Sequence, residues 1–196
     1  MNDLPTTVDE FLSRNDFSPR TVKAFRCDLT KFSRWLTAAN NERFDVGRIT
    51  VRDVADFRSH LRDVRRQSVA TVNRALVTLR RFLGHVVSAG AIATNPASAV
   101  KELRRMPVTP RGLTSAEVRK ILREVELRQD QKAAGIIGLM LQAGLRASEV
   151  IGLDLDDLTI GPRSGQLVCR QGKGNKQRIV PLSIEGRRVL SNYLEV

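Results

Sequence analysis

The sequence predicts a mainly α-helical protein of two domains, the second of which adds a small β-hairpin to its helices. Apolar residues recur every three or four positions over long stretches, which is the spacing of amphipathic helices. Prolines and glycines gather between residues 88 and 112 and interrupt that pattern. Near the C-terminal end, two short apolar segments flank a turn rich in Gly and Lys. We therefore expect a four-helix domain over residues 1–90, a linker over 91–111 and an α+β segment over 112–196.

Capping residues indicate where the helices of the first domain begin. Ser18 is suited to the N-cap, and Pro19 to the first helical position. The helix that follows places apolar residues on one face: Val22, Phe25, Leu29, Phe32 and Leu36. The other expected helices are a short one around Val8 to Phe11, one from Thr50 or Val51 to Val64, and one from Ser68 with Val69, Val72, Leu76, Leu79, Leu83 and Val86 in register.

The second domain begins with two further helices. Thr114 and Glu117 have the spacing of a capping box, which predicts a helix to about Leu127. An apolar helix is expected over 131–143, where Gly144 can end it in a left-handed conformation. The remaining elements are expected as strands at 167–170 and 178–182 and a final helix over 183–194.

The charge of the chain favours a polyanionic partner. Lys and Arg number 33 against 21 Asp and Glu, which gives a net charge of +12 and a pI near 10.9. A ribosomal or membrane-surface role would suit this charge as well. Aromatic residues make up only 5% of the chain, so stacking on single strands is disfavoured and double-stranded DNA is the expected partner.

The candidate DNA-binding residues are basic side chains on the polar faces of the predicted helices and at the hairpin. Arg74 and Arg81 are seven residues apart, which places them two turns along one helix face. An ordinary solvated surface is the alternative interpretation. The full set is Arg20, Lys23, Arg26, Lys31, Arg66, Arg74, Arg81, Lys176 and Arg178.

Cys27 and Cys169 are far apart and form no C-x-x-C pair, so we expect reduced thiols and no metal site. The N-terminus has acidic residues where a secretion signal has basic ones, and no apolar run reaches membrane-spanning length. We expect a cytoplasmic protein that does not act at a membrane.

Arg146 follows a glycine break at the start of a predicted helix whose Val150, Ile151 and Leu153 are expected to face inward. A guanidinium held near exposed backbone N–H groups can grip a phosphate with two donors and stabilise charge on its oxygens. The alternative is that Arg146 only forms an ion pair with Glu149 or Asp157.

The segment from Gly144, G-L-R-A-S-E-V-I-G-L-D-L-D-D-L, resembles the first catalytic-arginine motif of the tyrosine site-specific recombinases of the phage-integrase family. The resemblance implies that Arg146 is a catalytic arginine and that Glu149 and Asp157 support it. It also implies that residues 1–90 form a SAM-like core-binding domain and that residues 112–196 form the first part of a catalytic domain. Residues 18–36 and Asn95-Pro96-Ala97 are similar to that core-binding domain as well.

The segment G-K-G-N-K-Q-R-I-V-P-L, from Gly172 to Leu182, is similar to the catalytic hairpin of the same family. The resemblance implies that Lys173 protonates the departing 5′-hydroxyl as a general acid. Lys176 and Arg178 are expected to contact the DNA backbone or support the hairpin. Both motifs occur in the order that the family has them.

Other parts of the family's site are not found in the sequence. His60 and His85 lie in the first domain and neither has an arginine three residues later, so they do not supply the expected His-x-x-Arg pair. Tyr193 directly follows the hairpin, where the family has a packing residue, so we expect no nucleophile in this chain.

The resemblance implies that complete relatives cleave and rejoin DNA through a 3′-phosphotyrosyl intermediate, without cofactor, metal or small-molecule substrate. We expect this chain to bind duplex DNA without cleaving it. The relatives act as tetramers on DNA, and we expect this chain to be a monomer in solution. The alternatives are a non-catalytic remnant or regulator that occupies recombination sites, and an RNA-binding protein, which no aromatic platform supports.

Overall fold

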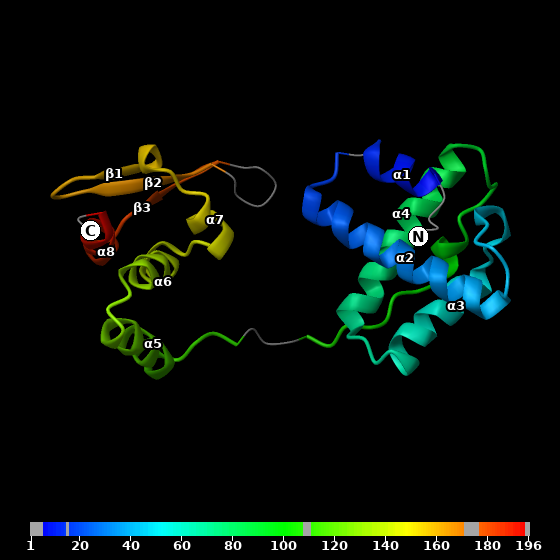
Figure 1. The fold of residues 1–196 in the computed structure, drawn as a ribbon, viewed down its shortest axis with the longest axis horizontal. Helices are drawn as coiled ribbons and strands as arrows, with labels where there is room; N and C mark the ends of the chain where they lie inside the picture. The colour runs from blue at the N-terminus through cyan, green and yellow to red at the C-terminus, as the bar shows by residue number, and fades with distance from the viewer. Residues whose placement is uncertain (1–5, 15, 108–110, 171–176, 195–196) are drawn as a thin grey trace. The chain divides into compact units, whose positions relative to one another are not determined.

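The computed structural model describes residues 6–14, 16–107, 111–170 and 177–194, and it divides into two compact units, Met1–Val108 and Thr109–Val196 (Figure 1). The first unit contains α1 (Thr6–Ser13), α2 (Pro19–Asn40), η1 (Val46–Arg48), α3 (Val51–Ser59), η2 (His60–Val64), α4 (Val69–Ser88) and η3 (Pro96–Ala99). The second contains α5 (Ser115–Leu127), α6 (Gln131–Ala143), α7 (Ala147–Ile151), η4 (Leu155–Asp157), β1 (Leu158–Ile160), β2 (Gly165–Cys169), β3 (Arg178–Pro181) and α8 (Ile184–Leu194). The mainly helical class with a small sheet is confirmed.

The predicted N-caps start the long helices as expected. The hydroxyl of Ser18 accepts a hydrogen bond from the backbone of Thr21 at 3.3 Å, and Ser68 and Thr71 repeat that geometry at the start of α4. These bonds satisfy backbone donors that have no partner within the first turn. The helix predicted over 51–64 begins at Thr50 with a capping box, but its last turn is the π-helical η2.

Aromatic and aliphatic side chains from four helices fill the core of the first unit. Phe11, Phe32, Phe57 and Phe82 are each at most 2% exposed. The Phe11 and Phe82 rings lie 5.7 Å apart, and the Phe32 and Phe57 rings 5.1 Å apart, both edge to face. Because each ring comes from a different helix, the core ties α1, α2, α3 and α4 together.

Much of the segment predicted as a linker lies against α4. Asn73 both donates to and accepts from the backbone of Leu103, each at 2.8 Å. Arg80 donates to the carbonyl of Val100 at 2.6 Å and to that of Ala97 at 3.2 Å. These bonds fix residues 97–103 to the first unit.

The second unit places its helices beside a three-stranded antiparallel sheet with the order β1-β2-β3 (Figure 1). β2 and β3 are the predicted hairpin strands, and Leu167 pairs with Val180. Strand β1, which pairs with β2 through Leu158 and Leu167, was not predicted. Helices α6 and α8 approach closely at Gly138. A Cβ atom at this position would lie only 2.5 Å from the Val189 side chain, so the absence of a side chain allows the contact.

One predicted core position is wrong. Ile151 is 80% exposed, whereas Val150 and Leu153 pack against the core of the second unit. Within α7, position 151 is turned away from position 150 by about 100°, and Leu153 lies beyond the end of the helix. Because α7 spans only five residues, a single face of it is buried. Among the helices described, none is long and apolar enough to cross a membrane.

Candidate functional site

Arg146 is held at the junction between α6 and α7. Gly144 ends α6 in the left-handed conformation, with φ of 62°, and Leu145 is buried directly after it. Arg146 is the N-cap of α7, and its backbone N–H donates to Oε2 of Glu149 at 2.8 Å. The glycine break, the buried leucine and the capping bond therefore fix the backbone from which the Arg146 side chain projects.

Glu149 is the central group of the site. Its side chain is 2% exposed, and Oε1 accepts a hydrogen bond from Nη1 of Arg146 at 2.8 Å. Arg178 adds two further bonds, from Nη1 to Oε1 at 3.0 Å and from Nη2 to Oε2 at 2.9 Å. Hydrogen bonds from Arg178, and then from the Arg146 backbone, lower the pKa of Glu149 from 4.5 to about 2, so the carboxylate stays ionised.

The alternative interpretation, that Arg146 only forms an ion pair with Glu149, therefore describes part of the observed geometry. The pair exists, but it uses only Nη1, and the Arg146 side chain is 60% exposed. Within the described residues, Nε and Nη2 of Arg146 have no hydrogen-bond partner. The buried carboxylate thus orients the guanidinium and leaves one of its edges open to a ligand.

Glu149 also makes the stability of the second unit depend on acid. A carboxylate whose pKa is lower in the folded state stabilises that state above its unfolded pKa, and the contribution is lost as the pH falls toward the folded pKa. We expect this loss between about pH 4.5 and about pH 2. The measurement is thermal unfolding across that range for wild type and Glu149→Gln. Because other carboxylates titrate in both proteins, a constant difference in melting temperature from pH 5 to about pH 2 would contradict the assignment.

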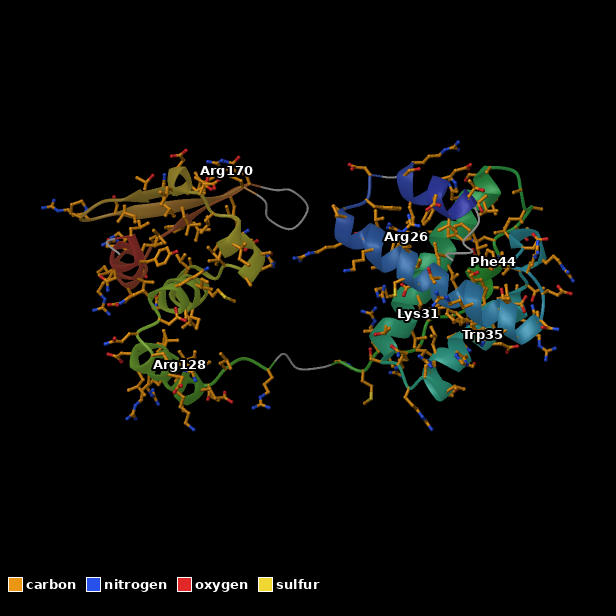
Figure 2. The ribbon with its side chains drawn as sticks, viewed as in Figure 1. Arg26, Lys31, Trp35, Phe44, Arg128 and Arg170 are labelled. Carbon is orange, nitrogen blue, oxygen red and sulfur yellow. The ribbon has the colours of Figure 1, made fainter. Side chains whose placement is uncertain are left out.

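A second buried carboxylate lies at the other arm of the hairpin. Asp157 is almost fully buried, accepts a hydrogen bond from the backbone of Asp154 at 3.1 Å and lies 2.5 Å from Nε of Arg170. Figure 2 labels Arg170 at the end of β2. Glu149 with Arg178 and Asp157 with Arg170 therefore hold the two arms of the hairpin. Arg170 is not among the site residues predicted from the sequence, although its place at the end of the first hairpin strand is a signal that could have identified it.

Arg178 has an ion-pair partner inside the second unit, because both of its terminal nitrogens bind Glu149, and Nη1 also donates to the thiol of Cys169 at 3.4 Å. A DNA contact by Arg178 stays a prediction. Lys173 and Lys176 lie outside the described residues. The described residues contain no group of three or more His, Cys, Asp or Glu side chains that could hold a metal ion.

In the first unit, α2 and α4 present three cations with different environments, which we call the α2–α4 face: Lys31, Arg74 and Arg81. Lys31 is exposed, and Figure 2 labels it on α2. Nη1 of Arg74 donates to Oδ2 of the buried Asp28 at 2.6 Å. The guanidinium of Arg81 lies 5.9 Å from the ring centres of both Phe17 and Phe25. Cation–π contacts of this length restrain Arg81 without removing its charge from the surface.

The structure also places the other predicted DNA-binding residues of the first unit. Arg20, Lys23 and Arg66 are exposed, and Arg66 has a positive φ of 50° after η2. Arg26 is less free, because its Nη1 donates to Asp9 at 2.7 Å.

Neither histidine lies near Arg146 in the chain, and both contact aromatic rings of the first unit. The ring of His60 is 6.0 Å from that of Trp35, and the ring of His85 is 5.6 Å from that of Phe11. Tyr193 lies on α8, and its ring packs against α6 at Gly135. A Cβ atom on Gly135 would be 3.2 Å from Cγ of Tyr193. This position matches the packing role predicted for Tyr193.

Two family models match most of the chain. Residues 8–90 match the N-terminal SAM-like domain of phage integrases, and residues 111–196 match the phage integrase family. Tyrosine recombinase XerC of Chlorobaculum parvum is 30% identical over 96% of this chain and 63% of its own length. Tyrosine recombinase XerD of Shewanella oneidensis is 29% identical over 95% of this chain and 61% of its own length. The chain thus spans about three fifths of these relatives.

The fold also resembles solved structures. A lambda integrase dimer bound to a COC′ core site matches with a TM-score of 0.74 at 18% identity, over 96% of this chain and 65% of that one. An integrase of the transposon Tn1549 in complex with circular intermediate DNA matches with a TM-score of 0.65 over 97% of this chain and 64% of that one, also at 18% identity. These matches show the fold. The two family models and the XerC and XerD relatives, together with the arginine motif and the hairpin, show that the chain belongs to the phage integrase family of tyrosine recombinases.

Proposed function

We propose that the chain acts in site-specific DNA recombination, by binding duplex DNA with its first unit and a DNA phosphate with Arg146. The observation that carries the proposal is the guanidinium of Arg146, oriented by the buried Glu149 and open on one edge. The net charge of +12 supports a polyanionic partner. The DNA bound to the lambda integrase and Tn1549 integrase of similar fold supports a duplex.

In this proposal Arg146 binds the non-bridging oxygens of the phosphate that is cleaved. A guanidinium can do so with two parallel hydrogen bonds, and it stabilises negative charge that grows on those oxygens in the transition state. Because Glu149 already fixes one nitrogen of Arg146, little side-chain freedom is lost when the phosphate binds. Glu149 is a positioning residue in this account, and it does not touch the DNA.

In this proposal Lys173 is the general acid that protonates the departing 5′-oxygen, as its position in the family motif implies. The ion pairs of Arg170 and Arg178 support this assignment, because they hold the residues on either side of the segment that contains Lys173. Asp157 is then a positioning residue for the hairpin. We also propose that the recombining assembly is a tetramer, as in the lambda integrase tetramer bound to a Holliday junction.

The role of Arg146 can be tested with single neutral methylphosphonates placed along a duplex that the chain itself selects from a random pool. At the phosphate that Arg146 contacts, the neutral substitution is expected to weaken binding of wild type by about tenfold, the size of a charge-assisted hydrogen bond. In Arg146→Ala that position should become insensitive, because the contact has already been removed. Other phosphates should keep their effects.

Arg128→Ala is the matched control, since Arg128 is an exposed arginine at the end of α5, labelled in Figure 2 and paired with Glu124 at 2.7 Å. It should show the wild-type pattern at every phosphate. A methylphosphonate profile of Arg146→Ala identical to that of wild type would exclude the phosphate contact.

A further inference from the structure

Asp28 is a carboxylate inside the helical core of the first unit. Its side chain is 2% exposed, and its Oδ2 accepts hydrogen bonds from Nη1 of Arg74 at 2.6 Å and from the hydroxyl of Thr78 at 3.0 Å. Burial nevertheless raises its pKa above the usual value, although Arg74, Thr78 and the nearby Lys31 all lower it. Loss of hydration therefore outweighs the partners of Asp28, and its ionised form is held at a cost.

Stability of the fold gives no reason for this ion pair. Replacing a buried ion pair by apolar side chains of similar volume is often neutral or stabilising. Thr78 does not depend on the pair either, because the carbonyl of Arg74, at 3.1 Å, can accept its one hydroxyl hydrogen in place of Asp28. What Asp28 does provide is a fixed position for one nitrogen of a surface guanidinium.

The rest of that guanidinium faces outward. The Arg74 side chain is 41% exposed, and its hydrogen bonds, to Asp28 and at 3.5 Å to the carbonyl of Ala24, all start from Nη1. In the described parts of the chain, Nε and Nη2 of Arg74 have no partner. These two nitrogens form an edge of arginine that can make two parallel hydrogen bonds to O6 and N7 of guanine.

The neighbours of Arg74 on the α2–α4 face are arranged differently. Lys31 carries a compact charge on a flexible stem, and Arg81 is restrained only by the rings of Phe17 and Phe25. Attraction to a phosphate requires charge near the backbone, whereas recognition of a base edge requires a fixed direction. Of these three cations, only Arg74 is bound to a buried carboxylate.

We propose that Arg74, oriented by Asp28, is a specificity-determining residue that recognises a guanine in the major groove, while Lys31 and Arg81 supply sequence-independent attraction to phosphates. The inference rests on the proposed duplex binding and adds to it the base that is recognised. It also gives a reason for the Asp28–Arg74 pair to be present although burial of the carboxylate is unfavourable.

The test is selection of bound sequences from a random duplex pool by the whole chain. Wild type is expected to prefer guanine at one or two adjacent positions. Arg74→Lys, which keeps the charge but not the planar edge, should reduce that preference by at least about fivefold. The double variant Asp28→Leu/Arg74→Met should do the same and still fold, because it replaces the pair with apolar side chains. Its thermal melting is recorded to verify this.

Arg81→Ala is the matched control from the same helix face. It should weaken binding to all sequences and leave the guanine preference unchanged. A preference retained in both Arg74 variants would overturn the inference while leaving duplex binding intact, and so would wild type that binds duplexes without any base preference. Absence of duplex binding by wild type would instead overturn the proposed function, and the inference with it.

Discussion

Replacing Glu149 with alanine is expected to open the second unit around Arg146 and to raise the reaction rate of the Cys169 thiol by roughly tenfold or more. Glu149 is the shared partner of Arg146 and Arg178, so its loss leaves two guanidinium groups close together without the carboxylate that holds them. Removing one partner from a buried ion-pair network is strongly destabilising, because the remaining charges are uncompensated. The base of β3 should loosen as a result.

Cys169 reports this opening directly. It is 2% exposed and contacts Nη1 of Arg178, so a thiol reagent reaches it only when the hairpin opens. Cys27 is exposed and reacts in every variant, which makes it an internal standard. Glu185→Ala is the matched control, since Glu185 pairs with Arg188 at 2.8 Å on the exposed surface of α8 and should change little. Equal Cys169 rates in both variants would contradict a central role for Glu149.

Helix beginnings could be predicted from the sequence because their signals are local. Ser18, Ser68 and Thr114 each cap a helix with a backbone bond to a residue three positions away. Gly144 likewise ends α6 in the conformation that its lack of a side chain favours. Such contacts depend on neighbouring residues alone, so no knowledge of the tertiary fold is required.

Two features of the second unit could not be predicted from local sequence patterns: strand β1 and the buried face of α7. Strand β1 has only three residues, and it forms because Leu158, Thr159 and Ile160 pair with β2. Ile151 was placed in the core because the inward face of the one-turn helix α7 could not be chosen from a run of three apolar residues in four. Strand β1 depends on its pairing with β2, and the buried face of α7 depends on what packs against it, so neither result follows from the segment's own residues.

The same limit applies to the candidate site. The motif identified Arg146, Glu149 and Asp157 as a group, but not which cation each carboxylate binds. The pairing of Glu149 with Arg178 spans 29 residues. The pairing of Arg74 with Asp28 spans 46 residues, and no local pattern indicates that Asp28 is buried. Charge patterns identify basic faces, and tertiary contacts decide which cations on them are fixed.

Binding of the chain to duplex DNA should be strong at low salt and fall steeply as salt rises. Each phosphate neutralised by a cation releases a counterion, so the logarithm of the binding constant falls linearly with the logarithm of the salt concentration. Proteins with six to ten phosphate contacts lose roughly a thousandfold or more in affinity between about 50 and about 200 mM salt. Lys31 and Arg81 on the α2–α4 face are the expected sources of part of this slope.

Duplex binding through α2 and α4 is tested by measuring this salt dependence in wild type, Lys31→Ala, Arg81→Ala and the control Arg52→Ala. Arg52 is an 89% exposed arginine on α3, outside the α2–α4 face. We predict that Lys31→Ala and Arg81→Ala each reduce the magnitude of the log–log slope by about 0.9 and that Arg52→Ala leaves it unchanged. Wild-type binding that does not vary with salt, or the same slope in all four proteins, would contradict duplex binding through α2 and α4.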